Sequence, residues 1–320
     1  MNAAVPQALP HRLRERPWWP WAMRGLAALF VGFIGWMLYQ YARDIEWSRV
    51  DDAVRALPAP VLALAAALAA CSHLLYSTFD LLGRHYTGHR LAAPTVMGVT
   101  FTSYAFNLNL GSIVGGVGLR YRLYSRLGLR GGAITRVLSL SLLTNWLGFL
   151  LLAGAVFALF PLPLPAQWQI GNGALRVAGF ALLGAAVAWG ALVTLSARRE
   201  FTLLGKRFAL PGPRMTLLQL ALSCTNWMLI AGVIWVLLQG QVAYTTVLAV
   251  YLLAAIAGVV TYIPAGLGVL EAVFLMLLGE QVGEPELLGA LLAYRAVYYL
   301  GPLLVAAVMY AVMETRARRA

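Results

Sequence analysis

Pro264-Ala265-Gly266-Leu267-Gly268 interrupts an apolar stretch that otherwise runs from Tyr244 to Gly279. Proline lacks the amide hydrogen that a helix needs, and closely spaced glycines favour turns, so these five residues predict a helix break. The stretch holds a single charged residue, Glu271, just after the break. The sequence therefore predicts two helices that meet at a turn, with one acid beside that turn.

The composition of the whole chain indicates a membrane protein. Hydrophobic residues make up 61% of the 320 residues and charged residues 11%, and the mean hydropathy is +0.76. A soluble protein carries about 25% charged residues. Apolar runs of about 20 residues recur along the chain, and no polar stretch is long enough for a large soluble domain. The predicted fold class is an all-α polytopic membrane protein.

The distribution of charge predicts how the chain crosses the membrane. The net charge is +12, and all 24 basic residues are arginine except Lys206. They cluster between apolar runs, which is typical of cytoplasmic loops and of contact with anionic lipids, so we expect no nucleic-acid partner. We predict a basic, aromatic cytoplasmic segment (residues 1–21), one transmembrane domain (22–313) and a basic cytoplasmic tail (314–320). The six full spans are predicted at residues 22–41, 58–82, 133–160, 174–195, 215–238 and 287–313.

Two further apolar stretches do not fit as full spans. If Pro94 to Gly118 crossed the membrane, the basic segment from Arg120 to Arg136 would lie outside, against the orientation rule. This stretch is also rich in glycine and asparagine. We therefore predict that it enters and leaves on the cytoplasmic side as a re-entrant hairpin, and that Tyr244 to Gly279 forms a second hairpin from the opposite face.

The resulting order is span, span, hairpin, span, and it occurs twice. The halves, residues 22–160 and 174–313, would form an inverted repeat, which is a recurring transporter plan. Cys71-Ser72-His73 in the second span is similar to Cys224-Thr225-Asn226 in the fifth. Chance similarity between helices rich in alanine and leucine explains this echo equally well.

Glu271 and Arg295 are the charges predicted deepest in the membrane. Counted from the helix ends, each lies about 12 Å below the outer surface. Because an unpaired charge there costs about 3 kcal/mol or more, we predict that they pair. One interpretation is a clamp between two helices. The other is a cavity lining, in which Glu271 binds a cationic headgroup or a proton and Arg295 meets a phosphate.

Arg120 and Arg122 form a second candidate site, because they follow the glycines Gly115 and Gly116. Backbone amides at a glycine-rich break, followed by guanidinium groups, suit a lipid phosphate. An ordinary basic interfacial helix is the alternative. Other polar residues have two interpretations each: Asp80 could pair with Arg84, Asn109 could be a ligand or an interhelical hydrogen-bonder, and Tyr298 could edge a cavity or pack.

Signatures of catalysis are missing from the sequence. His85 and His89 lack acidic or cysteine companions, so we expect no metal site. No phosphate-binding loop, zinc-protease motif or nucleophile elbow occurs. We expect neither a cofactor nor enzymatic chemistry.

Three elements together resemble a known family. Gly115-Gly116-Val117-Gly118-Leu119-Arg120, the segment from Pro264 to Glu271, and Arg295 with Tyr298 resemble the transmembrane domain of bacterial lysylphosphatidylglycerol synthases. This domain is the flippase part of the multiple peptide resistance factor, whose cytosolic domain makes aminoacyl-phosphatidylglycerol.

The resemblance covers nearly the whole chain and is greatest to stand-alone inner-membrane proteins of this kind. Because the chain stops at Ala320, it implies lipid translocation without a synthetase domain. It also assigns roles to Gly266, Gly268, Glu271 and Arg295.

The expected function is an inner-membrane flippase-like transporter in bacteria, with both termini cytoplasmic. Its cargo would be a phospholipid or an aminoacylated or polyprenyl-phosphate lipid. One alternative is a membrane-embedded enzyme that acts on lipid headgroups, and another is a non-transporting partner subunit of a lipid-synthesis enzyme. A homo-oligomer is also left open.

Overall fold

The computed structural model describes residues 47–160, 162, 171–196, 200–203, 206–261 and 266–319. The predicted N-terminal segment 1–21, the predicted first span 22–41 and Pro264 lie outside the described residues.

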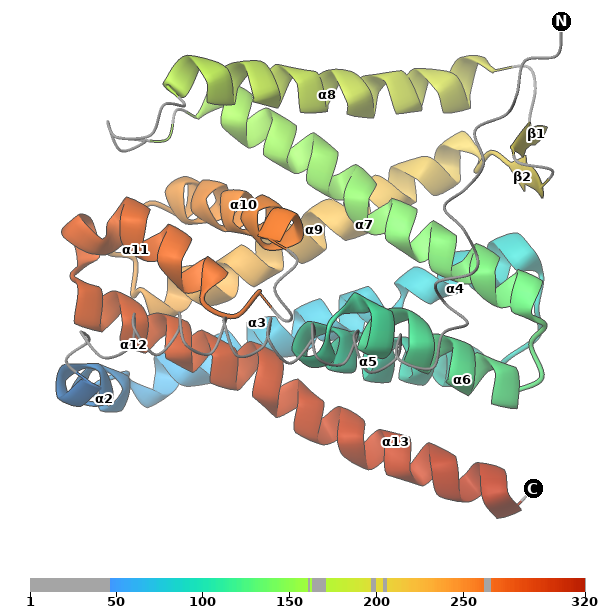
Figure 1. Ribbon diagram of the computed structural model, residues 1–320, viewed down its shortest axis with the longest axis horizontal. Coiled ribbons are helices and arrows are strands. Elements are labelled where there is room, and N and C mark those ends of the chain that lie inside the picture. Colours follow the sequence, from blue (N-terminus) through green and yellow to red (C-terminus); the bar gives the residue numbers. More distant parts are fainter. Residues whose placement is uncertain are drawn as a thin grey trace, which may run out of the picture. The chain divides into compact units, whose positions relative to one another are not determined.

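The described chain is helical apart from one short hairpin of strands (Figure 1). The elements are α2 (Trp47–Arg55), α3 (Ala59–Ser77), α4 (Phe79–Thr87), α5 (Ala93–Leu110), η2 (Ser112–Gly118), α6 (Leu119–Arg126), α7 (Gly131–Leu159), α8 (Asn172–Leu195), β1 (Glu200–Leu203), β2 (Lys206–Ala209), α9 (Pro213–Leu237), α10 (Tyr244–Thr261), α11 (Val269–Val282), α12 (Glu284–Tyr294), η4 (Arg295–Leu300) and α13 (Gly301–Arg319). The symbol η marks a π-helical turn. β1 and β2 pair antiparallel within the predicted basic loop, where no strands were expected.

Six helical segments of the described residues are long and apolar enough to cross a membrane. Five of them match predicted spans, and the sixth, Tyr244–Thr261, is the first arm of the predicted second hairpin. The span predicted at 58–82 continues to Thr87 through α3 and α4. The all-α polytopic class is confirmed.

A tight helical hairpin forms where the first re-entrant segment is predicted. α5 ends at Leu110, the chain reverses at Gly111, and η2 packs back against α5. A Cβ atom on Gly115 would lie 2.3 Å from the backbone carbon of Phe106. The two arms approach this closely because position 115 has no side chain.

The second hairpin is formed by α10 and α11, which pack against each other. Gly268 precedes α11 with a φ of +77°, in the left-handed region that glycine enters without strain. Both glycine-rich breaks therefore interrupt helices as predicted. The entry of the hairpins from opposite membrane faces stays a prediction.

α3 packs against α9, and α7 packs against both α8 and α9 (Figure 1). α13 packs against α5 of the first hairpin, and α7 packs against α10 of the second. In the predicted repeat, α13 corresponds to α7 and α5 to α10, so these two contacts are the mirrored pair that an inverted repeat requires. The repeat itself stays a prediction.

Candidate functional site

Glu271 and Arg295 lie together, as their predicted depths require. Arg295 donates from Nε to Oε1 of Glu271 at 2.8 Å and from Nη2 to Oε2 at 3.2 Å. The side chain of Arg295 is only 12% exposed and that of Glu271 only 16%. Two parallel hydrogen bonds to one carboxylate are the strongest arrangement that an arginine makes with an acid. The predicted pairing is present, and its role in binding stays a prediction.

The rest of the Arg295 guanidinium is also in contact with protein. Nη2 donates to the carbonyl oxygen of Gly266 at 3.0 Å, and the guanidinium carbon lies 4.5 Å from the centre of the Tyr299 ring. Cation–π contact of this kind adds to the stability of a partly buried charge. In this conformation Arg295 connects the break of the second hairpin, at Gly266, to the last long helical segment, Glu284–Thr315.

Arg295 and Tyr299 belong to η4, a π-helical turn between α12 and α13. Such turns interrupt the regular bonding of a helix and are frequent at functional sites. Asn109, near the tip of the first hairpin, donates to the carbonyl oxygens of Ala105 at 2.8 Å and of Tyr299 at 3.3 Å. Both hairpins therefore contact the same π turn.

Tyr298, on the same turn, is at the centre of a buried polar network. Its hydroxyl lies 2.8 Å from the hydroxyl of Ser72 and 3.0 Å from that of Tyr104. Ser72 also donates to the side-chain oxygen of Asn226 at 2.8 Å. The network joins α3, α5, α9 and η4, and Ser72 and Asn226 come from the two segments with similar sequence.

His73 is a polar residue of this region that sequence reasoning missed. Its Nδ1 lies 2.9 Å from the carbonyl oxygen of Ala69, and since a carbonyl only accepts, Nδ1 carries the hydrogen. Nε2 is buried with no hydrogen-bond partner among the described residues. The rings of Tyr298 and Tyr104 lie 4.7 and 5.2 Å from the imidazole. A histidine inside a predicted span was the only available signal.

Arg120 pairs with Asp80 inside the protein, so the prediction that Asp80 pairs with Arg84 is wrong. Arg120 Nε lies 3.4 Å from Oδ2 of Asp80, and Tyr124 donates to the same oxygen at 2.9 Å. Arg84 instead donates to the carbonyl oxygen of Leu91. The α6 helix turns Arg120 towards α4, whereas Arg84 points towards the loop that leads to α5.

Arg120 is only 6% exposed, yet it is poorly satisfied. Its Nε and Nη2 make no hydrogen bond within the described structure, and neither does Oδ1 of Asp80. The guanidinium lies 5.8 Å from the centre of the Tyr76 ring. This ion pair is looser than the one between Glu271 and Arg295.

A cavity of about 350 Å³ adjoins Arg120. It lies between α3, the first hairpin with α6, and α7, and Gly116 forms part of its wall. Its polar lining residues are Tyr76, Ser103, Tyr104, Asn107, Ser112, Arg120, Tyr121, Thr135 and Ser139. We call it the hairpin cavity.

Arg122 lies elsewhere, which corrects the prediction that it shares a site with Arg120. Arg122 is 52% exposed and pairs with Glu314 at 3.3 Å. Arg126 also pairs with Glu314. Residues two apart on a helix point in different directions, so only Arg120 of the two enters the protein.

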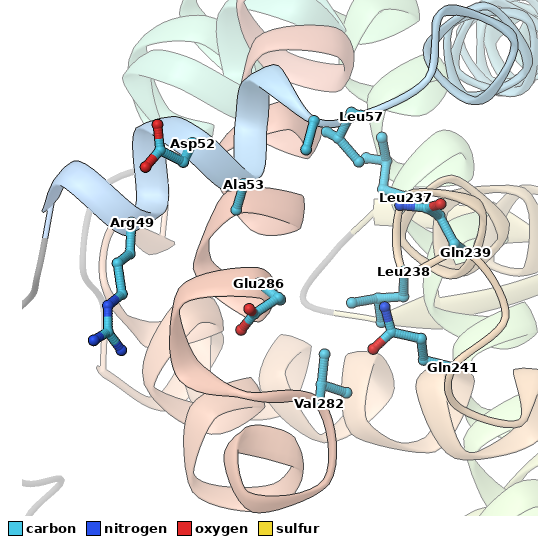
Figure 2. Close-up of a pocket in the computed structure, with 11 residues that line it drawn as sticks. Arg49, Asp52, Ala53, Leu57, Leu237, Leu238, Gln239, Gln241, Val282 and Glu286 are labelled. Carbon is cyan, nitrogen blue, oxygen red and sulfur yellow. The ribbon is translucent and has the colours of Figure 1, made fainter.

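A second cavity, of about 370 Å³, shares no lining residue with the hairpin cavity (Figure 2). It is lined by α2, by the end of α9 and the turn after it, and by the start of α12. Gln241 points towards α12 (Figure 2), and the carboxylate of Glu286 lies next to Gly283 at the start of α12. Sequence reasoning predicted no cavity here, although it placed all three of these loops on the outer side.

Metal ligands do not gather in the described residues, since they contain no group of three or more histidine, cysteine or acidic side chains that could hold an ion.

Comparison with known proteins identifies the family. The family model for the lysylphosphatidylglycerol synthase TM region matches residues 25–306. The chain belongs to this family. It is thereby confirmed as a multi-pass membrane protein of a family linked to membrane phospholipid metabolism.

Two relatives match over most of their length. The inner membrane protein YbhN of Escherichia coli is 43% identical over 96% of both chains. The uncharacterized protein slr0712 of Synechocystis is 31% identical over 87% of this chain and 86% of its own.

A third relative matches only in part. The phosphatidylglycerol lysyltransferase of Staphylococcus haemolyticus is 36% identical over 92 residues, which are 27% of this chain and 11% of that enzyme. The resemblance to a stand-alone inner-membrane member is confirmed.

Proposed function

We propose that this protein moves a phospholipid between the leaflets of the bacterial inner membrane, with both of its termini in the cytoplasm. The observation that carries the proposal is the meeting of two glycine-broken hairpins at one π turn. Asn109 binds this turn from the first hairpin, and Glu271 binds it from the second.

Buried charge supports this proposal over a purely structural role. Arg120 directly follows the first hairpin, and Glu271 lies in the second arm of the second hairpin. Each pairs with an opposite charge on a segment long enough to span the membrane. Ionisable residues inside membrane helices are costly and usually mark substrate or ion pathways. Inverted hairpins that meet at midplane are also a recurring transporter design.

The Glu271–Arg295 pair would hold the second hairpin closed. It closes the hairpin onto η4 through three hydrogen bonds. Passage of a polar headgroup then requires these bonds to open, and Arg295 can exchange the carboxylate for a lipid phosphate of similar geometry. A partner or an ion gradient would supply the energy, or else transport runs downhill.

Lipid movement in proteoliposomes tests the proposal. Fluorescent phospholipid in the inner leaflet is protected from an impermeant reductant until it moves outward, so the loss of protected signal measures translocation. We expect the parent protein to accelerate this loss, and Glu271→Gln to slow it by about tenfold or more. Arg55→Gln is the matched control, because Arg55 is an exposed partner of Asp51.

Removal of one partner leaves a buried charge, so Glu271→Gln could act through unfolding. The double variant Glu271→Gln/Arg295→Gln removes both charges, and we expect it to fold and still to translocate slowly. A double variant that transports at the parental rate would show that the pair is only a clamp.

The two alternatives have their own readouts. A headgroup enzyme would change the lipids, which mass spectrometry of the vesicles would detect. A partner subunit would leave vesicles inactive and co-purify with a lipid-synthesis enzyme. Either result in place of translocation would overturn the proposal.

A further inference from the structure

We infer that the hairpin cavity binds the phosphate of a lipid whose headgroup carries no positive charge, with Arg120 as the anchoring residue. This inference rests on the proposed function and names its substrate class. Of the three arginines that the sequence suggested as phosphate ligands, Arg120, Arg122 and Arg295, it selects Arg120.

Arg295 and Arg120 differ in what they can still bind. Arg295 gives hydrogen bonds to both oxygens of Glu271 and to Gly266, and it stacks on Tyr299. Arg120 has one ion-pair contact at 3.4 Å, and two of its nitrogens lack hydrogen bonds within the described structure. Because a buried donor without an acceptor is costly, a bound phosphate at Arg120 would stabilise the protein.

A second unsatisfied group lies in the same cavity. The hydroxyl of Ser103 is buried and has no partner among the described residues. Ser103 and Arg120 come from α5 and α6, and both line the cavity. Two under-satisfied donors on one wall point to a missing acceptor, which phosphate oxygens supply.

The lining also limits which chemical groups the headgroup can carry besides its phosphate. Arg120 is the one charged residue among the lining residues, and the others that are polar carry hydroxyl or amide groups. Asp80 is fully buried behind Arg120 and is not part of the lining. An ammonium group would meet no carboxylate here, whereas hydroxyl groups would find partners in Asn107, Thr135 and Ser139.

The opening of the cavity suits a molecule with acyl chains. Val117 of η2 and Leu142 of α7 line the cavity and are exposed. Ile113 and Val114 continue this apolar surface along η2. A headgroup could therefore occupy the cavity while its acyl chains stay against these side chains in the bilayer.

Equilibrium binding to the full-length protein in detergent tests the inference without any need for transport. Native mass spectrometry would compare three lipids with the same acyl chains: phosphatidylglycerol, phosphatidylethanolamine and lysylphosphatidylglycerol. We expect phosphatidylglycerol to bind about tenfold more tightly than either cationic-group lipid. Equal or tighter binding of lysylphosphatidylglycerol would overturn the headgroup assignment.

Variants on one helix locate the site. We expect Arg120→Gln to weaken phosphatidylglycerol binding about tenfold and the neighbouring Arg122→Gln to leave it unchanged. Since Arg120→Gln leaves Asp80 unpaired, Asp80→Asn/Arg120→Gln serves as a second variant without buried charge. If both variants bind like the parent, Arg120 is not the anchor.

Free glycerol 3-phosphate distinguishes a lipid from a soluble phosphate ligand. We expect it to compete poorly, because it lacks acyl chains, and competition at the same concentration as the lipid would overturn the lipid assignment. Selective binding without translocation in vesicles would refute the proposed function and leave this inference standing.

Discussion

At the scale of the residue, the part of the interior that the structure describes holds two ion pairs of different quality. Glu271 and Arg295 make a bidentate pair, whereas Asp80 and Arg120 make a single contact at 3.4 Å. An ion pair whose polar atoms all make hydrogen bonds stabilises one conformation. An ion pair with unused N–H groups retains hydrogen-bond donors for a ligand. This difference supports our proposals that the first pair closes the second hairpin and that Arg120 of the second pair binds a phosphate.

The hydroxyl of Tyr298 should matter for stability. Tyr298→Phe keeps the ring and removes the contacts with Ser72 and Tyr104, so we expect a loss of about 1–2 kcal/mol. Thermal unfolding in detergent would measure it. Tyr310→Phe is the control, because Tyr310 makes ring contacts with Phe106 and Arg122 that the change preserves. An equal loss of stability in the two variants would contradict a stabilising role of the hydrogen bonds of Tyr298.

The depth of a charged residue along its helix could be predicted from the sequence. Its ion-pair partner on another helix could not. Glu271 and Arg295 were predictable as a pair because each could be counted from its own helix end. Asp80 and Arg120 are 40 residues apart, on either side of a hairpin whose packing the sequence does not reveal. The direction of Arg120 into the protein depends on the rotation of α6.

At the scale of the element, the hairpins depend on close contact between their arms. Gly115 has no room for a side chain beside the backbone of Phe106 and Asn107. The π turn η4 is the other special element, because it contacts three different helices. Arg295 pairs with Glu271 of α11, and the hydroxyl of Tyr298 contacts Ser72 of α3. The carbonyl oxygen of Tyr299 accepts a hydrogen bond from Asn109 of α5. Glycine and proline signalled the breaks, but no residue pattern indicated the π turn.

Gly115→Ala should open the first hairpin. We expect a loss of about 1–3 kcal/mol in the free energy of unfolding, because the added methyl group overlaps backbone atoms that cannot yield. Gly132→Ala is the control, since nothing lies within 4 Å of a Cβ there. Chemical unfolding of both variants in the same detergent would compare them, and equal stability would contradict the hairpin packing.

At the scale of the whole molecule, the predicted topology agrees with which loops meet. α2, the turn after α9 and the start of α12 were all predicted outside, and they line one cavity (Figure 2). Arg122 and Arg126 pair with Glu314 near the C-terminus, and all three were predicted near the cytoplasmic side. Segments that charge counting places on the same side therefore lie near one another, and the membrane face on which each group lies stays a prediction.

Accessibility of the two hairpin tips tests most directly whether the hairpins enter from opposite faces. Single cysteines would be placed at the tips as Ser112→Cys and Leu267→Cys, in a background with Cys71→Ala and Cys224→Ala. An impermeant thiol reagent would be applied to inside-out or right-side-out vesicles. We expect Ser112→Cys to react from the cytoplasmic side and Leu267→Cys from the outer side. Reaction of both tips from the same side would contradict the account.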